Sequence, residues 1–270
     1  MSRVGFIGAG RMGLPMVRKL AEAGHEVRAL GRSPESRAAI YASGAEAFSD
    51  LSEIGQGADL VTVCVFSDDQ VRHVCLDSPL LAAMPSGAVL AVHTTVSPRT
   101  VETVAERAAA HGIDVIDAAV SGGPPDIAAG CLTLFLGGPE GAVARTRPIL
   151  QSYGDPILHV GPSGNGQRVK LVNNALFAAQ IGLLAEAADL GRQLGLDESV
   201  LLEALPHGSS ASRVMGRVAE RGSVGSFRSA VGEFLDKDVA VVRSTVAELG
   251  GDLGILEKVI SAGHPVRYPR

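Results

Sequence analysis

The chain has 270 residues, a formal net charge of −5 and 46% hydrophobic residues, but only 4% aromatic residues and no Trp. This length allows one large domain or two modest ones, and a core of Ala, Val, Leu and Ile suits helices packed on a parallel sheet better than an aromatic-rich β-sandwich. A net negative charge without runs of like charge excludes nucleic acid and anionic membrane surfaces as expected partners.

The first thirty residues have the proportions of a strand, a glycine turn, a helix and a second strand. Residues 4–7 are apolar, and the turn that follows reads Gly-Ala-Gly-Arg-Met-Gly. Glycines at such positions allow a tight turn and let the backbone approach a pyrophosphate, which the positive end of the next helix attracts. The pattern predicts dinucleotide binding over a plain glycine-rich turn, with these cofactor-binding residues: Gly8, Gly10, Arg11, Met12 and Gly13.

The residues after the second predicted strand indicate which dinucleotide binds. Chains that bind NAD usually carry an acidic residue about 20 positions after the glycine loop, where it bonds the ribose 2′-hydroxyl. Arg32 and Ser33 stand there instead, and the next acidic residue is Glu35. A guanidinium beside a hydroxyl can bind a 2′-phosphate through charge-assisted hydrogen bonds. We therefore expect NADP to be preferred, while a solvated Arg32 would leave NAD possible.

Five more apolar runs predict strands, at residues 59–66, 88–92, 113–120, 132–136 and 156–160. Thr94 and Thr95 follow one of them, at the strand end where open α/β sheets bind ligands, although hydroxyls there also cap helices. Ser121, Gly122 and Gly123 follow another and present successive backbone N–H groups suited to a carboxylate. Turn formation alone also explains these three residues.

From about Gly164 the apolar period changes to 3.6, which predicts one helix of nearly thirty residues, roughly 40 Å long. Its nearly all-round apolar character indicates burial in a helical core or against a second subunit. Only helices are expected beyond it, with starts at Asp197, near Ser209 and at Ser229. The predicted fold is a doubly wound Rossmann-type α/β domain, residues 1–162, and an all-helical domain, residues 163–270, joined by this long interdomain helix.

Lys170, Asn173 and Asn174 share one strip of the long helix, because they are spaced i, i+3 and i+4. Polar groups on an apolar helix are costly to bury without partners. A lysine that extends to solvent, with amides that bond nearby loops, explains the cluster. An acid/base role of Lys170, whose pKa would fall on desolvation, explains it equally well.

The three cysteines, Cys64, Cys75 and Cys131, show no metal-ligand spacing and are expected to be reduced and mostly buried thiols. We therefore predict no metal site. The N-terminus lacks a secretory signal, and no apolar run was expected to reach the length of a membrane span. These features predict a cytoplasmic protein without a membrane partner.

Four motifs in order, at residues 8–16, 117–123, 161–174 and 234–238, resemble the β-hydroxyacid dehydrogenase family, which includes 3-hydroxyisobutyrate dehydrogenase and tartronate semialdehyde reductase. The resemblance implies that Lys170 is the catalytic residue. It also implies substrate-binding roles for four residues, of which the first three would hold a carboxylate and the last a substrate oxygen: Ser121, Gly122, Gly123 and Asn174.

Two further positions match residues that line the cofactor in the family, Thr95 and Lys237. A surface ion pair of Lys237 with Glu233, four residues earlier, is the alternative for the lysine. The resemblance implies a homodimer or higher homo-oligomer that transfers a hydride between NADP(H) and a small β-hydroxy acid or semialdehyde. The alternatives are an imine reductase, which tends to carry another residue in place of Lys170, and a non-catalytic dinucleotide-binding descendant.

Three stretches depart from the family pattern, at residues 124–126, 206–209 and 263–270. The first, Pro-Pro-Asp, replaces a small residue and a glycine and is expected to reshape or stiffen the substrate loop. The second replaces an asparagine-containing turn. The third suggests that the last helix of the family is missing. These differences leave the identity of the substrate open.

Overall fold

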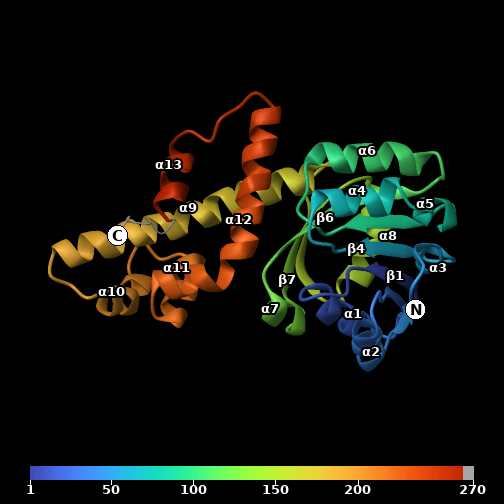
Figure 1. The fold of residues 1–270 in the computed structure, drawn as a ribbon, viewed down its shortest axis with the longest axis horizontal. Coiled ribbons are helices and arrows are strands. Elements are labelled where there is room, and N and C mark those ends of the chain that lie inside the picture. The colour runs from blue at the N-terminus through green and yellow to red at the C-terminus, as the bar shows by residue number, and fades with distance from the viewer. Residues whose placement is uncertain (264–270) are drawn as a thin grey trace. The chain divides into compact units, whose positions relative to one another are not determined.

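The computed structural model describes residues 1–263, and the chain divides into two compact units, Met1–Lys170 and a second that begins at Leu171. The first unit is an α/β domain, and every element of the second unit that the structure describes is a helix (Figure 1). The predicted fold class is therefore confirmed. The first unit also includes the start of the long helix, which the sequence analysis assigned to the second domain.

One eight-stranded sheet forms the centre of the first unit, with the order β3-β2-β1-β4-β5-β6-β7-β8. Neighbouring strands are parallel except β6 and β7. The order reverses at β1, which is the point where open α/β sheets form a ligand crevice. The strands are β1 (Arg3–Ile7), β2 (Glu26–Leu30), β3 (Glu46–Phe48), β4 (Leu60–Val63), β5 (Val89–Val92), β6 (Asp114–Ser121), β7 (Leu132–Gly137) and β8 (Gly154–His159).

Helices cover both faces of the sheet, because successive residues of each buried strand point to opposite sides. Phe6 packs in the same core as α1, α2 and α8, whereas Ile7 packs in the core formed with α3 to α6. Figure 1 shows α4, α5 and α6 on one side of the sheet and α1 and α2 on the other. These helices are α1 (Gly13–Glu22), α2 (Pro34–Ala42), α3 (Leu51–Gly55), α4 (Asp68–Leu76), α5 (Leu80–Ala83), α6 (Pro98–Ala109), α7 (Pro124–Ala128) and α8 (Glu140–Leu150).

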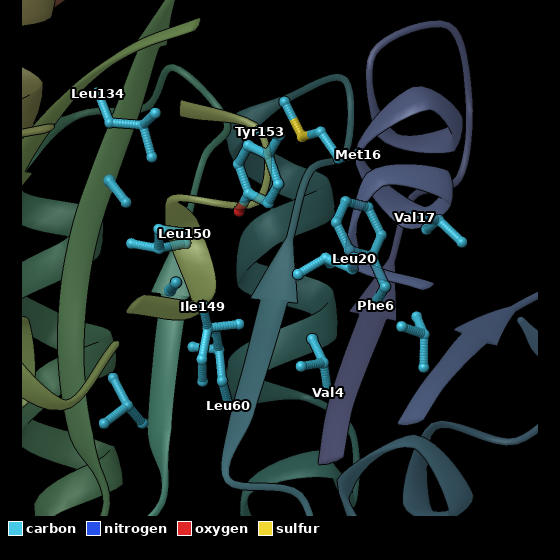
Figure 2. Close-up of a cluster of buried hydrophobic side chains, with 14 of the residues drawn as sticks. Val4, Phe6, Met16, Val17, Leu20, Leu60, Leu134, Ile149, Leu150 and Tyr153 are labelled. Carbon is cyan, nitrogen blue, oxygen red and sulfur yellow. The ribbon is translucent and has the colours of Figure 1, made fainter. Parts of the chain in front are cut away.

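The core on the α1 side contains the aromatic ring of Tyr153, which lies among side chains such as Phe6 and Met16 (Figure 2). Its hydroxyl is 2.8 Å from Nε2 of the buried His93, and Nδ1 of that ring is 2.6 Å from the carbonyl oxygen of Ala118. Because a carbonyl can only accept, Nδ1 donates and Nε2 accepts from Tyr153. Burial lowers the pKa of His93 to about 4 and keeps the ring neutral.

The second unit consists of helices around the long α9 (Asn165–Gln193), whose 29 residues confirm the predicted helix. The others are α10 (Glu198–Ala204), η1 (Leu205–His207), α11 (Arg213–Arg221), α12 (Val224–Glu248) and α13 (Ile255–Ala262). Helix α12 begins before the predicted start at Ser229, because the side chain of Ser223 caps it by accepting from the N–H of Ser226. The expected loss of a final helix concerns residues 264–270, outside the described residues.

Helix α9 is long and apolar enough to cross a membrane by length and composition, with a mean hydropathy of 1.3 over an 18-residue window. The expectation that no apolar run reaches this length was wrong in that respect. Since 44% of the window is buried within the protein, α9 also fits the signature of a core helix.

Candidate functional site

In the glycine loop after β1, a side chain at two of the glycines would overlap backbone atoms, whereas a side chain at the third would meet open space. Gly8 has φ +103°, and a Cβ there would overlap the carbonyl oxygen of Cys64. A Cβ at Gly13 would overlap the carbonyl oxygen of Gly8, so this glycine allows α1 to pack close to the strand. A Cβ at Gly10 would meet nothing within 4 Å. The loop is thus a cradle with open space at its central glycine.

No acidic side chain of the first turn lies at the start of helix α1, which follows this loop. Its N-cap residue is Met12, no side chain caps it, and its first turn holds no acidic residue. The N-terminus of a helix carries a partial positive charge and N–H groups that bind phosphates. The predicted pyrophosphate site therefore has donors that the first turn's own side chains do not occupy, with Arg11 exposed and Met12 half-buried beside it.

Arg32 and Ser33 lie between β2 and α2, and they differ in their local roles. Arg32 is exposed, whereas Ser33 is the N-cap of α2 and accepts from the N–H of Ser36 at 3.1 Å. A hydrogen bond from the Ser33 hydroxyl is the main cause that lowers the pKa of the exposed Glu35. Ser33 is thus partly a structural residue, and it holds an acidic side chain near Arg32.

The hydroxyls of the two threonines after β5 also differ in role, because that of Thr94 bonds the backbone of a neighbouring loop. The Thr94 hydroxyl accepts from the N–H of Val65 at 2.9 Å and is 3.1 Å from the carbonyl oxygen of the same residue. It therefore fastens the loop after β4. Thr95 is 7% exposed, and its hydroxyl makes no hydrogen bond with the residues that the structure describes. Of the two, Thr95 can offer its side chain to a ligand.

Asp117, a fully buried residue of β6, binds the start of α9. Its carboxylate accepts from the N–H groups of Gly164 at 2.8 Å and Gln167 at 2.7 Å. Burial raises the pKa of Asp117 to about 6, although these two donors oppose the rise. This role was not predicted from the sequence, although an acidic residue in the middle of a mostly apolar strand was a signal for it.

Gln167 also attaches the helix, to the segment that follows β5. The fully buried side chain donates to the carbonyl oxygen of Thr94 at 2.9 Å and accepts from the N–H of Val96 at 3.1 Å. Lys170 follows one turn later and is 9% exposed. The buried hydrogen bonds of Asp117 and Gln167 therefore fix the position of the turn that precedes Lys170.

In the second unit, Asn174 belongs to a polar cluster that joins α9 to α12. Its Nδ2 donates to Oδ2 of Asp238 at 2.8 Å, and Nζ of Lys237 forms an ion pair with Oδ1 of Asp238 at 3.0 Å. Asn173 donates from Nδ2 to Oδ1 of Asn174 at 3.3 Å. Asn173, whose role the sequence left open, thus orients Asn174, and the structure brings Asn174 and Lys237 together through Asp238.

The loop after β6 contains its own carboxylate. The N–H of Gly123 donates to Oδ2 of Asp126 at 2.7 Å, and Asp126 is 8% exposed. Gly122 has φ +135°, and a Cβ there would come within 2.9 Å of the same oxygen. The two prolines do more than stiffen the loop: Pro124 begins α7, and Asp126 caps this short helix.

None of the three cysteines forms a disulfide, and they differ in exposure. Cys75 is buried, and burial raises the pKa of its thiol to about 12. Cys64 is half-buried and Cys131 is exposed, so the expectation of mostly buried thiols was wrong for Cys131. Within residues 1–263, no group of three or more His, Cys, Asp or Glu side chains could hold a metal ion.

Two family models together match most of the chain. The NAD binding domain of 6-phosphogluconate dehydrogenase matches residues 3–161, and the NAD-binding domain of NADP-dependent 3-hydroxyisobutyrate dehydrogenase matches residues 164–262. The chain is 36% identical over 213 residues to 3-hydroxyisobutyrate dehydrogenase of Pseudomonas aeruginosa, covering 78% of this chain and 72% of the relative. It is 34% identical over 221 residues to 2-(hydroxymethyl)glutarate dehydrogenase of Eubacterium barkeri, covering 81% and 73%.

Solved structures show the same fold. The structure of 3-hydroxyisobutyrate dehydrogenase of Mycobacterium tuberculosis with L-serine superposes with a TM-score of 0.86 at 28% identity, covering 97% of this chain and 92% of the other. An imine reductase from a Pseudomonas species gives a TM-score of 0.66 at 21% identity, covering 97% and 99%. At that identity, the likeness to the imine reductase concerns the fold alone.

Proposed function

Because the chain belongs to the β-hydroxyacid dehydrogenase family, we propose that it interconverts a small β-hydroxy acid and its semialdehyde, with NADP(H) preferred and NAD(H) accepted as the cofactor. The observation that carries this proposal is the position of Lys170, a buried lysine one turn after a helix start that Asp117 binds to β6 and Gln167 binds to the segment after β5. The domains would be residues 1–162 for the cofactor and residues 163–270 for substrate binding and dimerisation.

The glycine cradle supports binding of the dinucleotide. Gly8 and Gly13 hold the backbone in the tight turn, Gly10 leaves room for a pyrophosphate, and the uncapped start of α1 attracts its charge. Arg32 and Ser33 would hold the ribose 2′-phosphate. Thr95 and Lys237 would contact the cofactor, as the matching residues do in the family. When bound, the nicotinamide supplies or accepts the hydride.

In this mechanism Lys170 moves one proton. As the alcohol carbon loses its hydride, the neutral amine takes the hydroxyl proton; in the reverse direction, the ammonium returns that proton to the carbonyl oxygen as the hydride arrives. Desolvation favours the neutral amine, and the burial of Lys170 supports this role. Asn174, oriented by Asn173 and Asp238, would bind the substrate oxygen.

The substrates that the names of the relatives give share one chemical unit. In 3-hydroxyisobutyrate, 2-(hydroxymethyl)glutarate and L-serine, the last from the name of an NAD-dependent L-serine dehydrogenase, a hydroxymethyl group is attached to the carbon that carries a carboxylate. They differ in the third substituent, which is a methyl group, a second carboxylate on a short chain, or an ammonium group. Ser121, Gly122 and Gly123 would hold the shared carboxylate.

The test is turnover of Lys170→Ala on a panel of the three hydroxy acids, their semialdehydes and cyclic imines, with NADP(H) and NAD(H). We expect turnover of the hydroxy acids to fall by about 10² to 10⁴, the usual contribution of a general acid/base, while NADPH binding is retained. Arg168→Ala, an exposed change on the same helix, is the control and should stay within about threefold of the parent. Near-normal turnover of a folded Lys170→Ala enzyme would rule out the mechanism, and reduction of imines alone would replace the proposed function.

The protein would act as a homodimer through an exposed strip of α9. Val172, Leu176, Leu183 and Leu190 are between 47% and 61% exposed, and at about 100° per residue they share one face of the helix. Such a continuous apolar strip is typical of an association surface. Leu183→Glu should produce monomers in light scattering, whereas Leu249→Glu, at an exposed site beyond α12, should not.

A cytoplasmic location would suit this chemistry and three cysteines of which none forms a disulfide. Fractionation of cells that express the untagged protein tests this location directly.

A further inference from the structure

We propose that Asp126 determines which charge class of β-hydroxy acid the enzyme accepts, and that it favours a zwitterionic β-hydroxy amino acid over a substrate with an additional negative charge. The proposal rests on the proposed function, because it concerns the loop that would hold the substrate carboxylate. Its basis is the carboxylate that the chain itself places against this loop.

The geometry of the loop leaves Asp126 close to two of the three residues that would bind substrate. Its Oδ2 accepts the N–H of Gly123 at 2.7 Å and would be 2.9 Å from a Cβ at Gly122. A substrate carboxylate at the loop would therefore find one N–H group engaged already. It would depend on the remaining donors of Ser121 and Gly122.

Asp126 also has a structural role, since it caps α7. The hydrogen bond that caps the helix does not remove the electrostatic effect, because the negative charge of Asp126 still repels a second carboxylate at the loop. Burial strengthens that effect: at 8% exposure the group is only weakly screened by solvent or salt. A neutral residue could provide the same cap, so the two roles can be separated by mutation.

The charge near the loop ranks the three substrate classes. A monoanion such as 3-hydroxyisobutyrate is repelled, and a dianion such as 2-(hydroxymethyl)glutarate is repelled more strongly. L-serine carries an ammonium group on the carbon next to its carboxylate, and this positive charge offsets the repulsion. Asp126 is therefore a specificity-determining residue that acts mainly on substrate binding and not on the proton transfer at Lys170.

The experiment compares kcat and KM of the parent enzyme, Asp126→Asn and Glu106→Gln for these three substrates. Asn keeps the size of the side chain and its Oδ1 can still accept from Gly123, so the cap is retained while the charge is lost. Glu106→Gln removes the same charge from an exposed position on α6 and controls for net charge. Asp126→Ser, a second neutral cap, serves if the first variant is poorly folded.

We expect Asp126→Asn to lower KM about tenfold for the monoanion, more for the dianion and less than threefold for L-serine, with kcat nearly unchanged; tenfold corresponds to about 1.4 kcal/mol. Glu106→Gln should leave KM unchanged for all three substrates. Turnover with an unchanged order of preference in both Asp126 variants would overturn the role of Asp126 alone. If the parent enzyme oxidises none of the three substrates, the proposed function fails, and the role of Asp126 fails with it.

Discussion

Two glycine-rich loops of the first unit follow the carboxyl ends of strands, but only one of them has a carboxylate bonded to its backbone. The loop at residues 8–13 leads into α1, whose start has no side-chain cap and no acidic residue in its first turn. The loop at residues 121–123 leads into α7, and there the carboxylate of Asp126, in the first turn of α7, accepts a hydrogen bond from the N–H of Gly123. No side chain caps the helix that follows the first loop, whereas a carboxylate already accepts one N–H group of the second loop.

The comparison shows that glycine content alone does not define an anion site. Glycines make backbone N–H groups accessible, but a nearby carboxylate decides how many of them a ligand can use. A second acid strengthens the contrast: Asp117 is buried in the strand that leads to the second loop, whereas β1, which leads to the first loop, has no acidic residue.

The largest effect is expected from Gly8→Ala in the first loop. A side chain at φ +103° is strained, and its Cβ would overlap the carbonyl oxygen of Cys64. We expect the free energy of unfolding to fall by about 3 kcal/mol or more, from strain and overpacking together. Urea denaturation, with the slope unchanged, measures the loss.

Gly130→Ala is the matched control for that change. Gly130 also has a positive φ, +71°, but a Cβ there would meet nothing within 4 Å. The control should lose only about 1 kcal/mol, the cost of the left-handed conformation. Equal losses in the two variants would show that the contact with Cys64 does not constrain the loop.

The next largest effect is the pH dependence of stability that Asp117 causes, in the strand that leads to the second loop. The pKa of Asp117 is about 6 in the folded protein, against 3.8 for an ordinary Asp, so the folded state binds the proton more tightly. The contribution of Asp117 to stability is therefore present below about pH 4 and is lost as pH rises through about 6. Asp117→Asn removes it, and on acidification from pH 7 to pH 4.5 the variant should lose about 2 kcal/mol more stability than the parent protein.

His93 gives the opposite slope and serves as the internal comparison. Its pKa is lowered from 6.5 to about 4, so its contribution to stability is present at neutral pH and is lost as pH falls through about 4. In His93→Gln, acidification should therefore cost less stability than in the parent protein. Parallel pH curves for Asp117→Asn and the parent would contradict the raised pKa of Asp117.

Gly10→Ala tests the open side of the first loop. Because a Cβ at Gly10 meets nothing, we expect the free energy of unfolding to change by less than about 0.5 kcal/mol. A methyl group in the path of the pyrophosphate should nevertheless disrupt about two charge-assisted hydrogen bonds and weaken NADPH binding by about 100-fold. Titration of the cofactor by fluorescence measures this change, and unchanged affinity would mean that the pyrophosphate does not approach Gly10.

Most of the fold could be predicted from the sequence because its signals are local. Apolar runs indicated seven of the eight strands, and the change to a 3.6-residue period indicated α9. The three-residue strand β3 was missed, since it owes its existence to pairing with β2 and not to a pattern of its own. Helix α7 was hidden by two prolines, which end a helix in its interior but fit its first turn.

The candidate site was less predictable, because several of its polar residues find their partners through tertiary structure. Asp117 bonds residues 47 and 50 positions later, and Asp238 bonds Asn174 from 64 positions away. No spacing rule reveals such pairs in a single sequence. The bond of Asp126 is local, in contrast, because Asp126 stands three residues after Gly123, which is the spacing of a helix cap. The sequence therefore did contain a signal for this residue.

The smallest effect is expected after β2, where Arg32 and Glu35 have opposite charges and would have opposite consequences for a 2′-phosphate. In the proposed site Arg32 would attract the phosphate, whereas Glu35, which is bonded to Ser33, would repel it and would accept from the 2′-hydroxyl of NAD. Both side chains are exposed, so each effect is limited by solvent screening. Arg32→Ala should reduce the ratio of NADP to NAD affinity about tenfold, and Glu35→Gln should raise it about threefold. If the ratio moves in the same direction in both variants, the pair does not select the cofactor, and the contrast between the two loops then rests on the pyrophosphate alone.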